Sequence, residues 1–326
     1  MVARIRVRKV GKRPRACRAT DPKGNPMATR KQLTESERAA RRQADRDRLE
    51  QAARALLTSE GWSRWVKVRS TNGLARYSFN NQLLIALQRH DATYVAGFRA
   101  FLKLNRCVRK GERGLRIFAP MSVLQHTDPD NAAPNAEDGE PQRRTMFRAV
   151  SVFDVSQTDP LPDTEPVPLE PPSEPINGDS HAHLLPQLEL LAGELGYTVS
   201  RRPLEGGADG WCDFKNHLIV ANTLLAPNAQ VRVLVHEIAH ALGVSYRDYG
   251  RKRAEVLVDT ATYIVCGSVG LDTSASTIPY IAGWGETGEL DSIRSYAETI
   301  DTIARRIEDA LRSSTADATE DIAIAA

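Results

Sequence analysis

The most constraining feature of this sequence is a His-Glu-x-x-His pattern, formed by His236, Glu237 and His240 inside the apolar segment VRVLVHEIAHALG. Residues i and i+4 share one face of a helix, so the two imidazoles can hold one metal ion together. We expect Asn228 to cap the start of this helix and Gly243 to end it. Two histidines suit zinc and leave room for a third ligand and a water, so Glu237 is predicted to be the general base that takes a proton from this water.

A third ligand is expected on the next predicted helix, RKRAEVLVDTATYIVCG, in which Glu255 and Asp259 are four residues apart. We predict that Glu255 is the ligand and that Asp259 accepts a hydrogen bond from a ligand histidine, which fixes the tautomer of that ring. Asp248, in the expected loop YRDYG, is the rival ligand. Ligation by two histidines and one glutamate favours zinc, so the expected cofactor is Zn²⁺.

The charge distribution divides the chain. The net charge is +11 over residues 1–48, +9 over 50–120, −9 over 121–181 and −8 over 182–326. With 326 residues, the chain is long enough for two domains. A basic front and an acidic back therefore predict two modules with different partners. No segment has the length and apolarity of a membrane span, and the basic start leads into no apolar segment, so we expect a cytoplasmic protein that does not contact a membrane.

Local patterns predict the element order. We expect one helix from Thr34 to Glu60, ended by Gly61, and further helices at about 79–89, 98–104, 184–195 and 292–311. Strands are expected in LRIFAPM and RAVSVFDVSQ, and a hairpin in WCDFKNHLIVAN. The expected organisation is a basic disordered arm (1–33), an N-terminal domain (34–157) with a loop insertion (125–142), an acidic Pro-rich linker (158–181), a C-terminal domain (182–311) and a disordered tail (312–326). The mixture of predicted helices and strands favours the α+β fold class. We also predict Met27, which opens MATRKQLTESERAARRQ, as an alternative translation start.

Residues 50–120 combine their positive charge with eight aromatic residues. Cations that follow phosphates and aromatic faces that stack on bases are typical of single-strand binding. Composition leaves the choice open, because the same aromatic residues can form a core and the same cations can serve solubility. The basic turn VRKGERG lies within this region.

At these residues the chain resembles the ArdC-type antirestriction proteins. The resemblance covers about residues 34–311 and rests on YSFNNQ, VRKGERG and VFDVSQT in the first half and on LVHEIAHAL in the second. It implies an N-terminal mixed α/β domain that binds single-stranded DNA, and a C-terminal zincin-like, mostly helical metallopeptidase domain with a small sheet, related to ImmA/IrrE-type peptidases. In such a protein of mobile elements or their hosts, the DNA-binding residues are expected to be Trp62, Trp65, Arg76, Tyr77, Asn81, Arg109, Lys110 and Arg113. The metal ligands carry over to His236, His240 and Glu255, and the catalytic base to Glu237.

Three functions remain open at this point. The first is a single-stranded-DNA-binding antirestriction protein that is also a zinc metallopeptidase, hence a hydrolase with a protein substrate. The second is a pure single-strand binder whose zinc site is structural or vestigial. The third is a regulatory metalloprotease that cleaves a repressor. A retained Glu237 favours the first, because a structural site needs no base. The sequence leaves the oligomeric state open.

Overall fold

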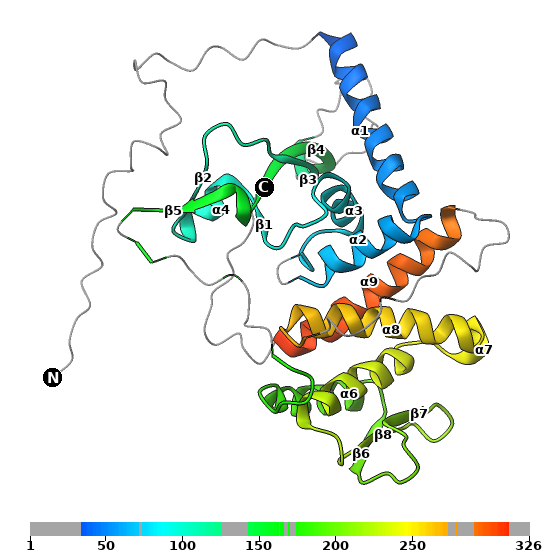
Figure 1. Cartoon of the computed structure of the whole chain (residues 1–326). Helices are drawn as coiled ribbons and strands as arrows, with labels where there is room; N and C mark the ends of the chain where they lie inside the picture. Colours follow the sequence, from blue (N-terminus) through cyan, green and yellow to red (C-terminus); the bar gives the residue numbers. More distant parts are fainter. Residues whose placement is uncertain are drawn as a thin grey trace, which may run out of the picture.

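The computed structural model describes residues 34–71, 74–124, 143–162, 164–165, 169, 174–272, 278 and 290–312. It combines helices with small sheets, which confirms the predicted α+β class (Figure 1). The expected arm (1–33) and loop insertion (125–142) lie outside the described residues, as does the expected tail apart from Arg312. We use "N-terminal half" for residues 34–160 and "C-terminal half" for residues 174–312.

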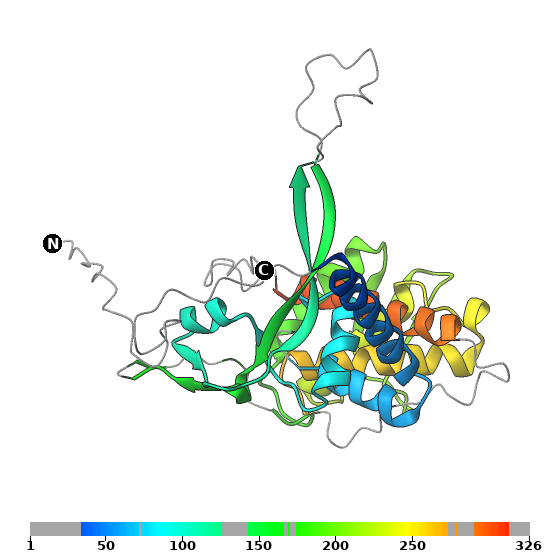
Figure 2. The same cartoon turned by 90° about the horizontal axis from the view of Figure 1, so that it is seen from above.

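The N-terminal half packs three helices against a short sheet. The helices α1 (Glu35–Ala55), α2 (Ser59–Arg69) and α3 (Phe79–Gln88) precede β1 (Val95–Ala96), α4 (Phe98–Lys103) and β2 (Arg106–Val108). The long strands β3 (Leu115–Leu124) and β4 (Arg143–Asp154) pair antiparallel, and β4 also pairs with β1. The short 3-10 helix η3 (Val155–Gln157) leads into β5 (Thr158–Pro160), which pairs with β2. Seen from above, the far ends of β3 and β4 project from the body as a two-stranded ribbon (Figure 2).

The predicted single helix over 34–60 is wrong, because the chain turns a corner between α1 and α2. The Thr58 side chain accepts a hydrogen bond from the Gly61 backbone N–H and so caps a new helix. Gly61 therefore lies in the first turn of α2 instead of ending α1. A Cβ at this position would lie 2.1 Å from the Ala55 carbonyl oxygen, so the close approach of the two helices requires a glycine.

Side-chain amides from α3 bind the outer edge of β3. Asn81 donates to the Phe118 carbonyl at 2.8 Å and accepts from the Phe118 N–H at 2.9 Å. Gln88 makes the same pair of bonds to the backbone of Arg116. The two amides therefore replace a neighbouring strand along the base of β3, and the ribbon continues beyond them.

The C-terminal half places two helices against a three-stranded sheet, and two longer helices pack on the other side of that pair. Its elements are η4 (Ala182–Leu184), α5 (Leu185–Glu194), β6 (Thr198–Arg202), β7 (Gly210–Asp213), β8 (Leu218–Asn222), α6 (Pro227–Ala241), α7 (Tyr246–Tyr249), α8 (Arg251–Ser268) and α9 (Leu290–Arg312). The sheet order is β6-β8-β7, with β6 parallel and β7 antiparallel to the central strand. Gly243 ends the α6 region at φ 112°, as predicted.

Asn228 does not cap α6, contrary to the prediction. The N-cap position is Ala226, and Pro227 occupies the first helical turn. Asn228 is fully buried, where its amide donates to the Pro175 carbonyl and accepts from the His181 backbone N–H. It therefore holds the end of the 158–181 segment against α6. Glu174 in the same segment pairs with Leu271, so both ends of the expected linker are attached to the folded body.

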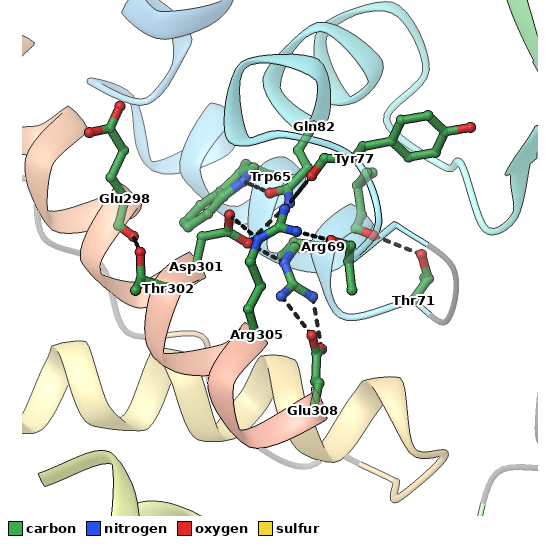
Figure 3. Close-up of polar contacts among 12 residues, drawn as sticks. Trp65, Arg69, Thr71, Tyr77, Gln82, Glu298, Asp301, Thr302, Arg305 and Glu308 are labelled. Carbon is green, nitrogen blue, oxygen red and sulfur yellow. Dashed lines mark hydrogen bonds and ion pairs between the residues drawn. The ribbon is translucent and has the colours of Figure 1, made fainter. Parts of the chain in front are cut away.

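The two halves share one continuous hydrophobic core, which runs from Ala52 in α1 to Leu311 in α9. Helix α9 lies between the N-terminal helices and α8 (Figure 1). A buried polar network crosses the same contact (Figure 3): Arg69 of α2 binds Asp301 and Glu308 of α9, and Gln82 of α3 also donates to Asp301. The C-terminal helix is therefore part of the packing of both halves.

Candidate metal centre

Helices α6 and α8 bring the three predicted ligands together. His236 and His240 lie one turn apart on α6, and Glu255 faces them from α8. One ligand atom from each residue lies within 4.8 Å of the others, and the His236 Nε2 atom is 3.5 Å from the Glu255 Oε2 atom. Zinc–ligand bonds of about 2.0–2.3 Å require ligand atoms at separations of this kind. The donor set therefore fits one small divalent cation.

Hydrogen bonds orient both histidines for ligation. The His240 Nδ1 atom is 2.8 Å from the Val244 carbonyl, which fixes its proton on Nδ1. The His236 Nδ1 atom is 3.2 Å from the Asp259 Oδ1 atom, within reach of a hydrogen bond from the ring to the carboxylate. Both rings consequently present an unprotonated Nε2 to the space shared with Glu255 when they are neutral. This arrangement is typical of metal-binding histidines.

Electrostatics differ between the two histidines. Burial lowers the pKa of His240 despite the bond to Val244. Burial also opposes the charged form of His236, but the hydrogen bond that its Nδ1–H donates to Asp259 and the negative charges of Glu237 and Asp259 outweigh it, so the pKa of His236 is raised. His240 is therefore the more easily deprotonated of the two imidazoles, whereas nearby carboxylates stabilise the protonated form of His236.

Glu237 is buried beside the ligands, next to the edge strand β7. Burial raises its pKa to about 7, because the opposing effects of His236 and of the Cys212 backbone N–H are smaller. A carboxyl group with a pKa near neutrality can both take and return a proton. Gly210 of β7 lies beside this side chain, and a Cβ there would lie 2.6 Å from the Val220 carbonyl oxygen and 2.6 Å from a Val233 methyl carbon, so the close packing at this point of β7 requires a glycine.

Tyr246 is a neighbour of the site that the sequence analysis missed. Its hydroxyl donates to the Glu255 Oε1 atom at 2.5 Å, and its ring centroid lies 5.3 Å from that of His240. The sequence signal for this neighbour was the aromatic residue at the start of YRDYG. The segment forms the short helix α7 instead of the expected loop. Asp248 from this segment accepts from the Ser245 hydroxyl and is not part of the three-residue cluster found among the described residues.

The predicted DNA-binding aromatics are buried. Trp62 and Trp65 are 0% and 1% exposed and stack edge-to-face in the core, so their rings are closed to bases in this structure. Tyr77 is buried and donates to the Val95 carbonyl. Asn81 holds β3, as described above. The structure does not bring these four side chains to a common surface.

The predicted DNA-binding cations are exposed, but some of them are engaged. Arg76 donates to the Val95 carbonyl and lies over the Tyr94 ring. Arg109 pairs with Glu112 and with Asp159. Lys110 and Arg113 are exposed in the same turn. The basic turn is therefore accessible to phosphates, while most of the expected stacking rings are not.

Comparison with known proteins identifies the N-terminal half. Residues 48–153 match the family model of the N-terminal domain of the anti-restriction factor ArdC. Residues 48–153 therefore form a domain of the antirestriction class. Within that class the domain is of the ArdC type, which confirms the resemblance inferred from the sequence for this part of the chain.

Similar chains extend the comparison. An uncharacterized protein of Bacillus anthracis is 26% identical over 252 residues, which are 66% of this chain, and the matched region spans 42% of that relative's length. The crystal structures of the antirestriction ArdC protein from the R388 plasmid are also similar. The metal-free form has 16% identity and a TM-score of 0.44 and covers 75% of this chain and 87% of that one. The Mn(II)-bound form has 15% identity and a TM-score of 0.46 and covers 83% and 99%.

Among the described residues, no helix combines the length and apolarity that crossing a bilayer requires.

Proposed function

We propose that this protein is a metal-dependent hydrolase of peptide bonds whose N-terminal half binds single-stranded DNA. The observation that carries the hydrolase is the convergence of His236, His240 and Glu255, with the carboxyl group of Glu237 buried beside them. A purely structural metal site has no use for that carboxyl group. The antirestriction role of the ArdC type would then combine DNA binding with action on a protein substrate in the cytoplasm.

The cofactor is proposed to be a divalent metal, and zinc in particular. Two imidazoles and one carboxylate form a donor set that suits zinc and leaves further coordination positions free. The Mn(II)-bound form of the R388 ArdC protein supports a divalent ion in this class of protein. A divalent cation held by the three ligands would polarise the scissile carbonyl group and acidify a water molecule.

The chain's own residues supply the proton transfers. Glu237 takes one proton from the attacking water while the water oxygen bonds to the carbonyl carbon. It returns this proton to the leaving amine as the C–N bond breaks. Asp259 holds His236, and the Val244 carbonyl holds His240, so the ligands keep their orientation. The Tyr246 hydroxyl donates a hydrogen bond to one carboxylate oxygen of Glu255, and the other carboxylate oxygen faces His236.

Single-stranded DNA is the second proposed ligand. The match of residues 48–153 to the ArdC N-terminal domain and the exposed basic turn with Lys110 and Arg113 favour it. Cationic side chains on an exposed turn contribute salt-dependent affinity for phosphates. Trp62 and Trp65 have no place in this proposal, because their burial closes them to bases.

The decisive experiment compares the full-length protein with its Glu237→Gln variant. Metal content is measured by native mass spectrometry after zinc loading, and hydrolysis is measured on a mixture of fluorescence-quenched peptides. We expect equal metal content, and a loss of hydrolysis of about 10²-fold or more in the variant. Equal hydrolysis in both proteins would overturn the catalytic role. Restriction protection that survives in Glu237→Gln would favour the pure DNA-binding function with a structural or vestigial site.

DNA binding is tested separately on the full chain. A labelled single-stranded oligonucleotide and its duplex are titrated over a salt series. Tight, salt-dependent preference for the single strand supports the proposal. No salt-dependent affinity would remove DNA as a ligand and leave a regulatory protease as the remaining candidate.

A further inference from the structure

The β3–β4 arm, defined here as residues 119–124 and 143–148, carries exposed apolar side chains that the fold does not use. Phe147 is 68% exposed and Met146 is 47% exposed. Figure 2 shows the arm extending away from the rest of the molecule. Isolated apolar residues on a surface are ordinary, but a largely exposed aromatic ring on a projecting ribbon contributes little to folding.

The base and the end of the ribbon differ sharply in burial. Ile117, Ala119 and Val152 are buried, and Asn81 fastens the backbone of Phe118 to α3. Beyond Ala119 the described β3 residues are exposed or half-buried, as are the β4 residues Thr145–Arg148. The arm is therefore held rigidly at its base while its end faces solvent. A rigid base gives the exposed side chains a defined position before any partner binds.

Strand register divides the arm into two faces. Phe147 lies opposite Pro120, and Met146 lies opposite Met121. Because side chains alternate along a strand, Phe147 and Pro120 share one face, and Met146, Met121 and Arg148 share the other. One face thus carries the Phe147 ring next to Pro120. The other face carries the exposed side chains of Arg148 and Met146.

The edge of β3 is a poor template for an added strand. The backbone groups of Arg116 and Phe118 point outward to α3, so the period of two places the backbone of Pro120 outward as well. Proline has no N–H to donate to a neighbouring strand. A partner that reads side chains therefore fits this side of the arm better than one that extends the sheet.

We propose that the β3–β4 arm is a contact surface for single-stranded DNA, with the Phe147 ring stacking on a base and the Arg148 guanidinium meeting a phosphate. This inference rests on the DNA-binding function proposed above and gives that function a location. Two observations favour this location. The tryptophans expected to stack are buried, whereas Phe147 is the more exposed of the two exposed phenylalanines, with Phe98 at 37%. The matched ArdC domain also includes most of both strands.

Charge along the arm limits where phosphates can lie. The sequence between the strands, 125–142, has five Asp or Glu residues and no Lys or Arg. β4 carries three arginines, at positions 143, 144 and 148. Favourable contacts with phosphates must therefore come from the strands, and Arg148 is the arginine nearest the base of the arm. Because Phe147 and Arg148 lie on opposite faces of the arm, the DNA is expected to cross the edge of β4 between them, with a base on the Phe147 face and a phosphate on the Arg148 face.

The test uses the full-length protein and a labelled oligothymidylate, with Phe147→Leu, Phe147→Trp and Phe98→Leu as variants. Loss of a stacking ring weakens single-strand binding by about 5- to 150-fold, so we expect that range for Phe147→Leu. Phe147→Trp is expected to bind at least as well as the wild type, with quenching of the new tryptophan's fluorescence. Phe98→Leu is the matched control and is expected to change the affinity less than Phe147→Leu does. Arg148→Gln is expected to reduce the salt slope by about 0.7, the value for one phosphate on a single strand.

The outcomes separate this inference from the function on which it rests. If the wild type does not bind oligothymidylate, the DNA-binding proposal itself fails. If the wild type binds and Phe147→Leu binds equally well, DNA binding stands and the arm is not its site. Thermal unfolding of each variant checks that the fold is intact, which is expected because the substituted side chains are exposed.

Discussion

Arg69 and Glu308 are 239 residues apart in sequence, yet two guanidinium nitrogens of Arg69 each lie 2.8 Å from a different carboxylate oxygen of Glu308. Both side chains are buried. Burial opposes the charge on Arg69, but Glu308 and Asp301 outweigh it, so the pKa of Arg69 is raised. The pair joins α2 of the N-terminal half to α9 at the end of the chain (Figure 3). The two halves are therefore coupled through buried charge as well as through their shared core.

Glu308→Ala should destabilise the whole protein. Removal of one partner leaves the other charge buried and only partly compensated, which costs about 3–5 kcal/mol. The free energy of unfolding is measured in urea, by circular dichroism and by tryptophan fluorescence. Because the core is continuous, we expect a single transition with both probes and a lower midpoint for the variant.

Glu194→Ala is the control for that experiment. Glu194 pairs with Arg306, also on α9, at 2.6 Å, but both side chains are about half exposed. Exposed pairs contribute about 0–1 kcal/mol, so the control should lose little stability. Two separate transitions in the wild type, or equal losses in the two variants, would contradict a coupled core.

Gly61→Ala should destabilise the corner between α1 and α2. The new methyl group would meet the Ala55 carbonyl oxygen at 2.1 Å, so the two helices must separate. Overpacking of this kind costs about 1–3 kcal/mol. Gly193→Ala in α5 is the control, because a Cβ there meets nothing within 4 Å and should stabilise the helix by about 0.5–1 kcal/mol. Thermal unfolding should therefore shift in opposite directions. A gain in stability for Gly61→Ala would disprove the steric argument.

The sequence predicted which residues meet at the candidate metal centre better than it predicted which residues of the N-terminal half are exposed, for a physical reason. The spacing of His236 and His240 on a helix is local, so it determines a shared face without knowledge of the tertiary fold. Whether Trp62 packs inside or stacks on a ligand depends on which elements cover it, and the sequence contains no local signal for that. For the same reason the ion pair of Arg69 could not be predicted, because its partner Glu308 lies near the other end of the chain.

The break at Thr58 was missed because helical periodicity continues across it. The capping hydrogen bond from Gly61 to Thr58 competes with that periodicity, and tertiary packing favours the corner. Tyr246 was missed because a hydroxyl that reaches Glu255 depends on the helix α7, which is only four residues long. The sequence thus predicted most of the elements, but it did not predict this helix boundary, the short helix α7 or the long-range contacts.

Asp259→Ala should weaken metal binding without removing a ligand. The Asp259 carboxylate holds the His236 ring at 3.2 Å, and loss of such a partner typically costs about 10- to 100-fold in metal affinity. Zinc affinity is measured by competition with a chromophoric chelator. Asp248→Ala is the control, since its carboxylate contacts Ser245 and lies outside the ligand cluster. Equal affinities for the two variants would show that Asp259 does not support the ligand.

Glu237→Gln should change how the stability of the metal-free protein depends on pH. Burial raises the pKa of Glu237 from 4.5 to about 7, so the folded state holds a proton that the unfolded state releases earlier. The stability contributed by this proton is fully present below about pH 4.5 and is lost as the pH rises through about 7. Glutamine imitates the protonated form, so the variant should match the wild type in acid. It should be more stable at pH 8 by on the order of 2–3 kcal/mol. Urea unfolding in the presence of a chelator, repeated across this pH range, measures the difference, with Glu298→Gln on the exposed face of α9 as the control. Parallel curves for Glu237→Gln and the wild type would mean that Glu237 is already charged in the folded protein near pH 5, and that it is less suited to accept and return a proton at neutrality.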